Sequence, residues 1–504
     1  MVIKMSEGEG KSMAQVHNIR AAKKIVETVK STLGPMGMDK MMVDGGGNVI
    51  VTNDGATILR ELDVAHPGGK MMVEVAKTQE NLCYDGTTST VVLAGQLLAN
   101  SEMLFEKGLH PNVICRGYHE AAQMATNYLK DNISQDGSDK ELLVKVARTA
   151  ITGKTLENAL DKVAALCVDA VKKAGDAESV RVLPLPGDSL EDSYLFNGVV
   201  VNKDYYIECA VPNQTRALLV NTGLTQEKND DNVQVQLDAE SYQTFKASSK
   251  DDILSHAKSI VALLPDGGVL FCRDSVDDHV CAFLKKNNVA VVRRVQQSTL
   301  KALSKSLGIE IAQTALDIEE SAEAVIRRQR HNDVWYLFVE GNCAADMGTL
   351  ILRGATTHTL EEVERGFDDA LGVVSLVMNN DSYVYGGGTA YVEMAAHLRK
   401  HAATIGGRAQ MAIEAFSDAL ETIPATIAEN AGYDPLDTVL AMRHEILNDI
   451  TWMGPDVEEG GLTDMKALGV YEPTALVRQA VLSAGEVAIA LLRIDDIIGR
   501  RPVE

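Results

Sequence analysis

The two ends of the chain share one kind of sequence pattern, and the middle has another. Near the N-terminus, apolar residues recur at spacings of three and four, which indicates one face of a helix; they are Ile19, Ala22, Val26, Val29 and Leu33. The last part of the chain carries a similar stripe, formed by Leu476, Ala480, Val481, Ala484, Val487, Ala488 and Leu491. Between about residues 199 and 340, short apolar runs alternate with helical patterns, as in an α/β domain. One economical arrangement therefore builds a single helical domain from both ends and inserts the α/β part through a connecting domain.

The length of the chain agrees with several domains, because 504 residues exceed what one hydrophobic core usually supports. The predicted fold class is multidomain, α and α/β. Helices are predicted at residues 69–81, 88–107, 112–129 and 156–173, and a hairpin is predicted to join runs 41–43 and 49–51. The short apolar runs of the α/β part are 260–264, 269–272, 289–292 and 334–339.

Charge and cysteine content exclude several classes of partner. The chain has 71 acidic and 48 basic residues, a formal net charge of −23, so its field repels nucleic acid and anionic lipid. Its seven cysteines form no CxxC pair, which disfavours zinc and a disulfide framework. Early charges interrupt any signal-peptide core, and no uncharged run approaches membrane-spanning length. We therefore expect a soluble, cytoplasmic protein with no nucleic-acid or membrane partner.

The loop Asp85-Gly86-Thr87-Thr88-Ser89 is the first candidate for chemistry. It precedes a predicted helix, whose free N–H groups and positive dipole end favour a bound phosphate. Gly86 lets the backbone approach a ligand, the hydroxyls donate to phosphate oxygens, and Asp85 offers a carboxylate to Mg²⁺. An ordinary helix cap uses the same residue types and, for this motif alone, is the more frequent explanation.

Other segments have the same two interpretations. Leu33-Gly34-Pro35 is either a helix stop or a glycine loop beside a nucleotide, and Asp54-Gly55 is either a cap or a carboxylate near magnesium. Residues 386–388 form a glycine triplet between a predicted strand and a helix, where ribose or phosphate can approach the backbone. Asp369, Lys154 and Glu472 are unremarkable in isolation. The standard phosphate loop GxxxxGK[ST], the GxSxG elbow and the HExxH pair are all absent from the sequence.

Taken together and in order, these motifs resemble group II chaperonins, the family of the archaeal thermosome and the eukaryotic cytosolic ring chaperonin. The resemblance covers both ends of the chain closely and the middle third loosely. The matching segments are residues 33–35, 37–41, 52–59, 70–77, 85–89, 152–154, 369–371, 386–388, 472–473 and 493–498.

The resemblance implies a division into three domains. A mainly helical equatorial ATPase domain would comprise residues 1–131 and 383–504. A small α/β intermediate domain would comprise residues 132–198 and 349–382, and an inserted α/β apical domain, which contacts unfolded protein, residues 199–348. Such subunits assemble into a double ring of identical or paralogous copies, so unfolded or partly folded client proteins and other subunits are the implied partners.

The resemblance also implies roles for single residues, with ATP and Mg²⁺ as cofactors. Asp85 would hold the metal, Asp369 would orient the attacking water from the hinge domain, and Lys154 would sense the terminal phosphate; these three form the catalytic set. Such a division suits phosphoryl transfer, which depends on positioning and charge neutralisation. The remaining nucleotide-binding positions are Leu33, Gly34, Pro35, Asp54, Gly55, Gly86, Thr87, Thr88, Ser89, Gly387 and Glu472.

The sequence also departs from the family pattern. Tyr84 stands where the family usually has glycine before the aspartate, and it either crowds a nucleotide or faces away from it. The segment 236–252 corresponds to the protrusion that forms the family's lid, but its apolar content is thin. We therefore weigh three hypotheses: an ATP-driven folding machine, which leads; a structural or holding ring subunit with slow or absent turnover; and, much weaker, a small-molecule kinase.

Overall fold

The computed structural model describes residues 10–43, 46–47, 49–154, 159–225, 253–341, 347–354 and 357–497. The chain forms two compact units: unit 1 combines Met1–Asp169 with Glu362–Glu504, and unit 2 is Ala170–Glu361. The chain passes from one unit to the other within two helices, α7 (Leu160–Ala174) and α11 (Thr357–Asn380). Unit 1 is therefore discontinuous in sequence.

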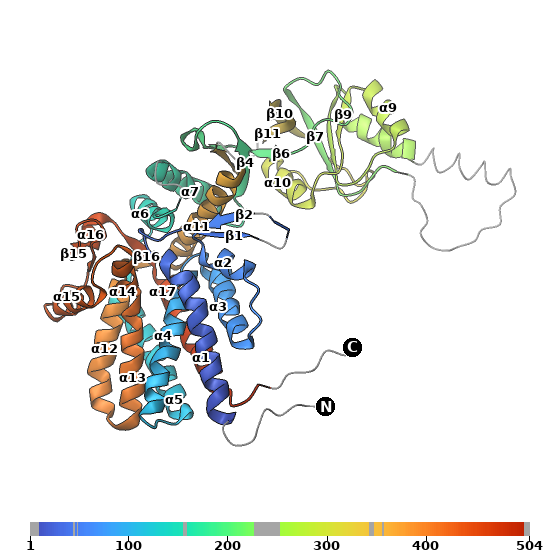
Figure 1. Cartoon of the computed structure of the whole chain (residues 1–504). Helices are drawn as coiled ribbons and strands as arrows, with labels where there is room; N and C mark the ends of the chain where they lie inside the picture. The colour runs from blue at the N-terminus through green and yellow to red at the C-terminus, as the bar shows by residue number, and fades with distance from the viewer. Residues whose placement is uncertain are drawn as a thin grey trace, which may run out of the picture. The chain divides into compact units, whose positions relative to one another are not determined.

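Long helices from both chain ends form the core of unit 1 (Figure 1). The C-terminal helix α17 packs against α3, α4 and α5, and α13 packs against α4, α5 and α12. Both α4 and α17 are buried along most of their length, as helices at the centre of a bundle are. These helices are α1 (Gly10–Val29), α3 (Pro67–Cys83), α4 (Thr87–Glu106), α5 (Pro111–Tyr128), α12 (Thr389–Ile405), α13 (Gly407–Leu420) and α17 (Thr474–Leu492).

Among the described helices, α17 alone is long and apolar enough to cross a membrane, judged by length and composition. Its apolar stripe, however, packs within unit 1, and from Leu476 to Leu491 the predicted stripe residues are all buried. Its two charged residues, Arg478 and Glu486, lie on the exposed side. This helix therefore has the burial expected of a core helix.

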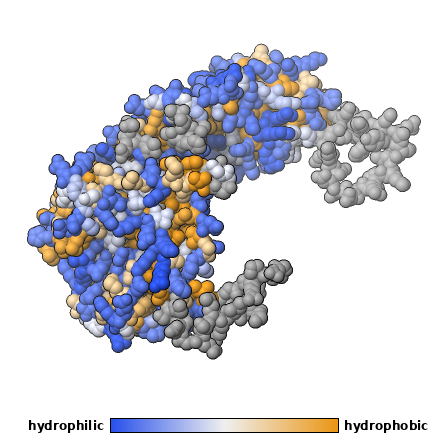
Figure 2. All heavy atoms as spheres, in the orientation of Figure 1, coloured by the Kyte–Doolittle hydropathy of each residue, from blue (hydrophilic) through white to orange (hydrophobic). Residues whose placement is uncertain are grey.

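Smaller elements complete unit 1. A three-stranded sheet joins distant segments in the order β16–β13–β3, with Val384 opposite Glu472. These elements are β1 (Lys40–Val43), β2 (Val49–Thr52), α2 (Gly55–Glu61), β3 (Gln135–Asp136), α6 (Lys140–Ile151), β13 (Ser382–Tyr385), α14 (Thr422–Asn430), α15 (Pro435–Leu447), β14 (Met453–Pro455), β15 (Leu462–Asp464), α16 (Met465–Leu468) and β16 (Tyr471–Pro473). Figure 2 shows hydrophobic residues gathered near the β1–β2 hairpin and α2, where Met36, Met38, Met41, Val43, Val49 and Val51 are exposed.

A buried carboxylate between α13 and α14 forms ion pairs with arginines of α12 and α15. Glu421 is 5% exposed and lies between two guanidinium groups. Arg399 donates to its Oε1 at 2.6 Å and Arg443 at 2.7 Å. Burial alone would raise the pKa of Glu421, but the two arginines outweigh it and hold the pKa below its ordinary value.

Unit 2 is built on a six-stranded sheet in the order β6–β11–β10–β7–β8–β9, in which β7, β8 and β9 are parallel. Alternate residues enter different apolar clusters: Leu219 and Phe271 join one that includes α10, and Leu218 and Leu270 join another that includes α9. This sheet is therefore covered on both faces. Its elements are β6 (Val199–Val201), β7 (Gln214–Val220), β8 (Gly268–Cys272), α9 (Asp278–Lys286), β9 (Val289–Val292), α10 (Gln297–Leu307), β10 (Ala322–His331) and β11 (Val334–Gly341).

A second, three-stranded sheet of unit 2 has the order β4–β12–β5. Its strands are β4 (Arg181–Pro186), β5 (Tyr194–Phe196) and β12 (Thr349–Gly354). The first two in this order are parallel, whereas β5 runs antiparallel to β12.

The structure confirms the predicted multidomain α and α/β fold class and most predicted elements. One apolar run of the predicted α/β pattern, residues 260–264, does not form a strand: its first four residues end a helix, Ile253–Leu263. An apolar run of five residues fits a strand or the end of a buried helix equally well. The proposed lid segment, 236–252, lies outside the described residues, and the three-domain division stays a prediction.

Candidate functional site

A cavity of about 750 Å³ lies in unit 1 and is lined by residues from both chain ends. Thirteen of the fourteen predicted site residues line it, namely Leu33, Gly34, Pro35, Asp54, Gly55, Asp85, Gly86, Thr87, Thr88, Ser89, Lys154, Gly387 and Glu472. The fourteenth, Asp369, is not among the described residues that line the cavity. It forms an ion pair with Lys154, which is one of the lining residues. The fold therefore brings together segments that are up to several hundred residues apart in sequence.

The N-terminus of α4 opens on this cavity without a side-chain cap from any described residue. Its N-cap is Gly86, at φ 77°, and the first helical hydrogen bond is donated by the Thr90 N–H. The N–H groups of the preceding residues are therefore available to a ligand, and the helix dipole adds positive potential. Asp85 is not the cap, because its Oδ1 accepts from the Gly86 N–H at 2.7 Å.

A second helix, α12, begins at the same cavity in the same way. Its N-cap is Gly388 at φ 79°, preceded by Gly387 at φ 66°, and in the described structure no side chain caps it. A Cβ atom on Gly387 would lie 2.9 Å from the Met465 sulfur, so the turn has no room for a side chain. Two helix N-termini thus face one cavity, an arrangement suited to an anion.

Asp54 caps helix α2, which is one of the two roles that the sequence allowed for it. Its Oδ1 accepts from the Ala56 N–H at 3.2 Å and its Oδ2 from the Thr57 N–H at 2.8 Å, so it caps α2 while also lining the cavity. The next residue, Gly55, packs on the start of α4: a Cβ there would lie 2.3 Å from Thr88 Oγ1. Close contact between the two helix starts therefore requires glycine at this position.

Lys154 and Asp369 form an ion pair beside the cavity, with side chains only 15% and 20% exposed. Burial raises the pKa of Asp369 to about 7; Asp85 and Asp54 act in the same direction, and Lys154 opposes them. Burial disfavours the charged form of Lys154, but attraction to Asp369 and Asp85 outweighs it and raises its pKa, so the amine stays protonated. Lys154 is thus a protonated amine close to the carboxyl groups of Asp369, Asp85 and Asp54.

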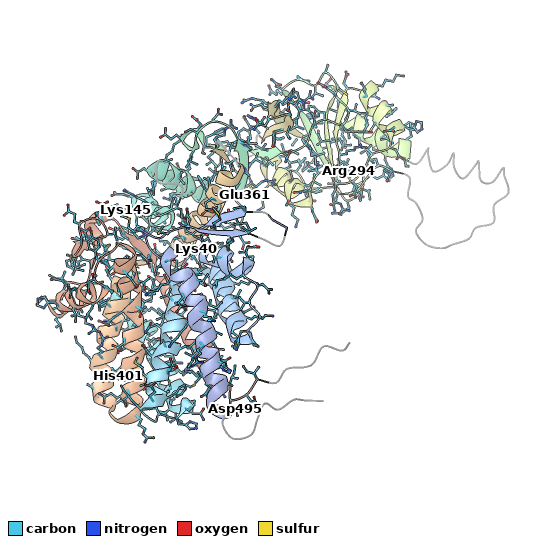
Figure 3. All side chains as sticks on the ribbon, viewed as in Figure 1. Lys40, Lys145, Arg294, Glu361, His401 and Asp495 are labelled. Carbon is cyan, nitrogen blue, oxygen red and sulfur yellow. The ribbon has the colours of Figure 1, made fainter. Side chains whose placement is uncertain are left out.

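Glu472 reaches the cavity from β16, the strand that pairs with β13. Burial raises the pKa of Glu472 to about 7, and the nearby Asp85 adds to the shift. Next to it, the Tyr471 ring lies 5.9 Å from the Lys145 amine of α6, which is labelled in Figure 3. This sheet therefore fixes one wall of the cavity.

Two of the cavity's polar residues that were not predicted have buried atoms without a partner in the described structure. Asn53 donates to the Gly153 carbonyl at 2.6 Å, next to Lys154, and its buried Oδ1 has no partner among the described residues. The buried hydroxyl of Tyr391, in the first turn of α12, is likewise unpartnered within the described structure. Buried polar atoms normally have partners, so these two point to a polar ligand. Their nearness to predicted motifs was the one sequence signal available.

The residues present fit a magnesium ion that arrives with its nucleotide. Searching the described ranges finds no group of three or more His, Cys, Asp and Glu side chains arranged to hold a metal by themselves. Mg²⁺ is commonly held by one or two carboxylates, with phosphate and water oxygens completing its shell. Asp85, beside the uncapped start of α4, provides one such carboxylate.

Tyr84 is not among the described residues that line the cavity. It ends α3 in the left-handed conformation, at φ 63°, and its N–H donates to the Glu80 carbonyl at 2.8 Å. Of the two orientations considered from the sequence, the ring takes the one that leaves the cavity clear.

The sequence matches the TCP-1/cpn60 chaperonin family over residues 25–502. It is 40% identical to thermosome subunit beta of Methanothermobacter thermautotrophicus, covering 96% of this chain and 91% of the relative. Thermosome subunit alpha of Archaeoglobus fulgidus is 38% identical, with 100% and 95% covered, and the thermosome subunit of Methanopyrus kandleri 40% identical, with 97% and 92% covered. The chain therefore belongs to the TCP-1/cpn60 chaperonin family. Within it, these archaeal relatives place the chain among the group II chaperonins, and its function is that of a chaperonin.

Proposed function

We propose that this chaperonin binds Mg-ATP in the cavity of unit 1 and hydrolyses it to drive the folding of client proteins. The observation that carries the proposal is the uncapped start of α4, which opens on the same cavity as the Lys154–Asp369 pair. The helix start would take the phosphates, and Asp85 would hold Mg²⁺, which neutralises charge on the phosphate oxygens when bound. Gly34, Gly387 and Glu472 would line the rest of the nucleotide site.

Hydrolysis in this proposal depends on Asp369. When ionised, its carboxylate would accept a hydrogen bond from the attacking water and orient it toward the terminal phosphate. Its pKa of about 7 lies near working pH, where a proton acceptor is effective. Lys154 would leave its ion pair in part to meet the terminal phosphate, so nucleotide binding and the position of Asp369 are linked.

We propose further that the protein works in the cytoplasm, in a double ring of identical or paralogous subunits, with unfolded or partly folded proteins as clients. Hydrolysis would close a lid formed by the inserted domain. The names of the thermosome subunits support assembly from subunits, and the exposed apolar residues of the β1–β2 hairpin offer surface for contact. The alternative, a holding subunit with slow or absent turnover, predicts the same ring without appreciable hydrolysis.

Steady-state ATP turnover by wild type and Asp369→Ala tests this function. The matched control is Asp368→Ala, which removes from the same helix a neighbouring carboxylate that is not among the described residues lining the cavity. We expect a loss of at least about a hundredfold in turnover for Asp369→Ala and little change for the control. Equal rates in all three proteins would refute the active-enzyme proposal, and particle images with and without ATP would test ring formation and lid closure.

A further inference from the structure

We propose that Tyr84 is a positioning residue for ATP hydrolysis: its ring occupies the hollow over Gly372 and fixes α11, with Asp369, against the 85–89 loop. This inference rests on the proposed function. It assigns a role to the residue at which the sequence departs most clearly from the family pattern. Three observations, on Tyr84, on Gly372 and on their neighbours, carry it.

The backbone of Tyr84 is in a conformation that favours glycine. It lies at φ 63° at the C-terminal end of α3, where a side chain with a Cβ atom is strained and glycine is the usual residue. A tyrosine at this position therefore lowers the stability of the turn, unless its side chain makes a compensating contact.

Gly372 shows the opposite mismatch: a glycine where the backbone conformation favours other residues. It is buried in the interior of α11. Glycine destabilises a helix interior, because it loses more backbone freedom on folding than other residues do. A Cβ atom on Gly372 would lie 1.9 Å from Tyr84 Cγ and 2.4 Å from Tyr84 Cδ2. The ring therefore sits directly on the bare backbone of the helix, and no side chain fits beneath it.

Each unfavourable residue explains the other. The glycine makes the hollow, and the tyrosine fills it, so two local exceptions to backbone preference produce one close contact. Real Cβ atoms do not approach within 3.0 Å of other heavy atoms, so alanine at 372 would force the ring or α11 to move. The contact is consequently specific to this pair.

The contact lies between the two parts of the proposed catalytic site. Tyr84 directly precedes Asp85, and Gly372 follows Asp369 by three residues, on neighbouring faces of the same helix. The next residue, Val373, lines the cavity. Because reaction rates depend on the placement of catalytic groups to within about 1 Å, a close-packed contact here fixes Asp369 relative to the phosphate loop.

The test uses four variants of the full-length, assembled protein: Tyr84→Phe, Tyr84→Gly, Gly372→Ala and the double variant Tyr84→Gly/Gly372→Ala. We expect kcat for ATP to fall about tenfold or more in Tyr84→Gly and in Gly372→Ala, with KM within about twofold of wild type. Tyr84→Phe keeps the ring and should retain wild-type kcat. The double variant should recover much of the loss in Gly372→Ala, because the new methyl group enters the space that the ring has left.

A nucleotide-free measurement separates this inference from the proposed function. Amide hydrogen exchange of the α11 segment 369–377 should be faster in Tyr84→Gly than in wild type and Tyr84→Phe, with no ATP present. Unchanged exchange and unchanged kcat in Tyr84→Gly would overturn the inference, as would equal losses in Gly372→Ala and the double variant. If wild type itself hydrolyses no ATP while the exchange difference is present, the proposed function fails and only the packing contact stands.

Discussion

The raised pKa of Asp369 makes a quantitative prediction about the pH dependence of ATP turnover. In the proposed mechanism Asp369 must be ionised to accept a hydrogen bond from water, and burial raises the pKa of this carboxyl to about 7. The pH dependence of kcat/KM reports the free protein, which is the state described above. We therefore expect kcat/KM for Mg-ATP to rise with pH through neutrality.

The size of the rise follows from the ionised fraction. A carboxyl group with a pKa of about 7 is about 9% ionised at pH 6 and about 91% at pH 8, so kcat/KM should increase about tenfold. A carboxyl group with the ordinary aspartate pKa of 3.8 is fully ionised over this range and would give a flat profile. The two cases are therefore distinguishable without an exact value.

The assay is the steady-state release of phosphate between pH 6 and 8 at saturating Mg²⁺, for wild type, Asp369→Asn and Glu472→Gln. Glu472 is the matched control, because burial also raises its pKa to about 7. ATP itself also titrates in this pH range, but this effect is the same for all three proteins. It therefore cancels in the ratio of their kcat/KM values. Asp369→Asn should be at least about a hundredfold slower and lose the rise, whereas Glu472→Gln should keep it. A flat wild-type profile, or a rise that disappears in Glu472→Gln alone, would refute the assignment to Asp369.

Three further predictions concern single substitutions. In Lys154→Met the rise in kcat/KM should move to higher pH, because the cation that lowers the pKa of Asp369 is gone; an unchanged midpoint would show that the ion pair does not tune this group. Gly86→Ala should be less stable by about 1 kcal/mol, because its φ is 77°, and a new Cβ would also lie 2.8 Å from Leu476 Cδ2. Thermal unfolding and nucleotide titration would measure that loss and the weaker binding expected with it, and wild-type values for both would contradict the role of the αL cap. Glu421→Gln should destabilise unit 1 by about 2 kcal/mol in urea unfolding near pH 7, because it removes the charge of a buried carboxylate that accepts hydrogen bonds from Arg399 and Arg443. Since the pKa of Glu421 is lowered in the fold, this difference should shrink as pH falls below 4.5, and a constant difference would argue against a charge effect.

The fold was predictable where the sequence pattern is long and regular. The stripe of α17 and the predicted helices at 88–107 and 112–129 keep the 3.6-residue period over many turns. The observed helices α4 and α5 begin and end within one residue of the predicted bounds. The run 260–264 failed because five apolar residues do not distinguish a strand from a buried helix end. Sheet order in unit 2 depends on contacts between distant strands, which no local pattern encodes.

The site could be predicted only from its motifs taken together. Each motif alone fits an ordinary cap or turn, and Asp54 does cap a helix in the structure. The uncapped start of α4 is a property of the Gly86 backbone, and Asp85 in the sequence suggested the opposite. Asn53 and Tyr391 were missed because a buried atom without a partner is visible only after the chain has folded.

The discontinuity of unit 1 has a consequence for its own synthesis. Helices α3, α4 and α5 pack on α17, yet 345 residues lie between Tyr128, the end of α5, and Thr474, the start of α17. At the usual rate of about 5 to 20 residues per second, the ribosome needs about 20 to 70 s to make that stretch. During this time the apolar faces that α17 will cover remain open to water. Every newly made subunit of this chaperonin therefore passes through a state with the exposed apolar surface of a chaperone client.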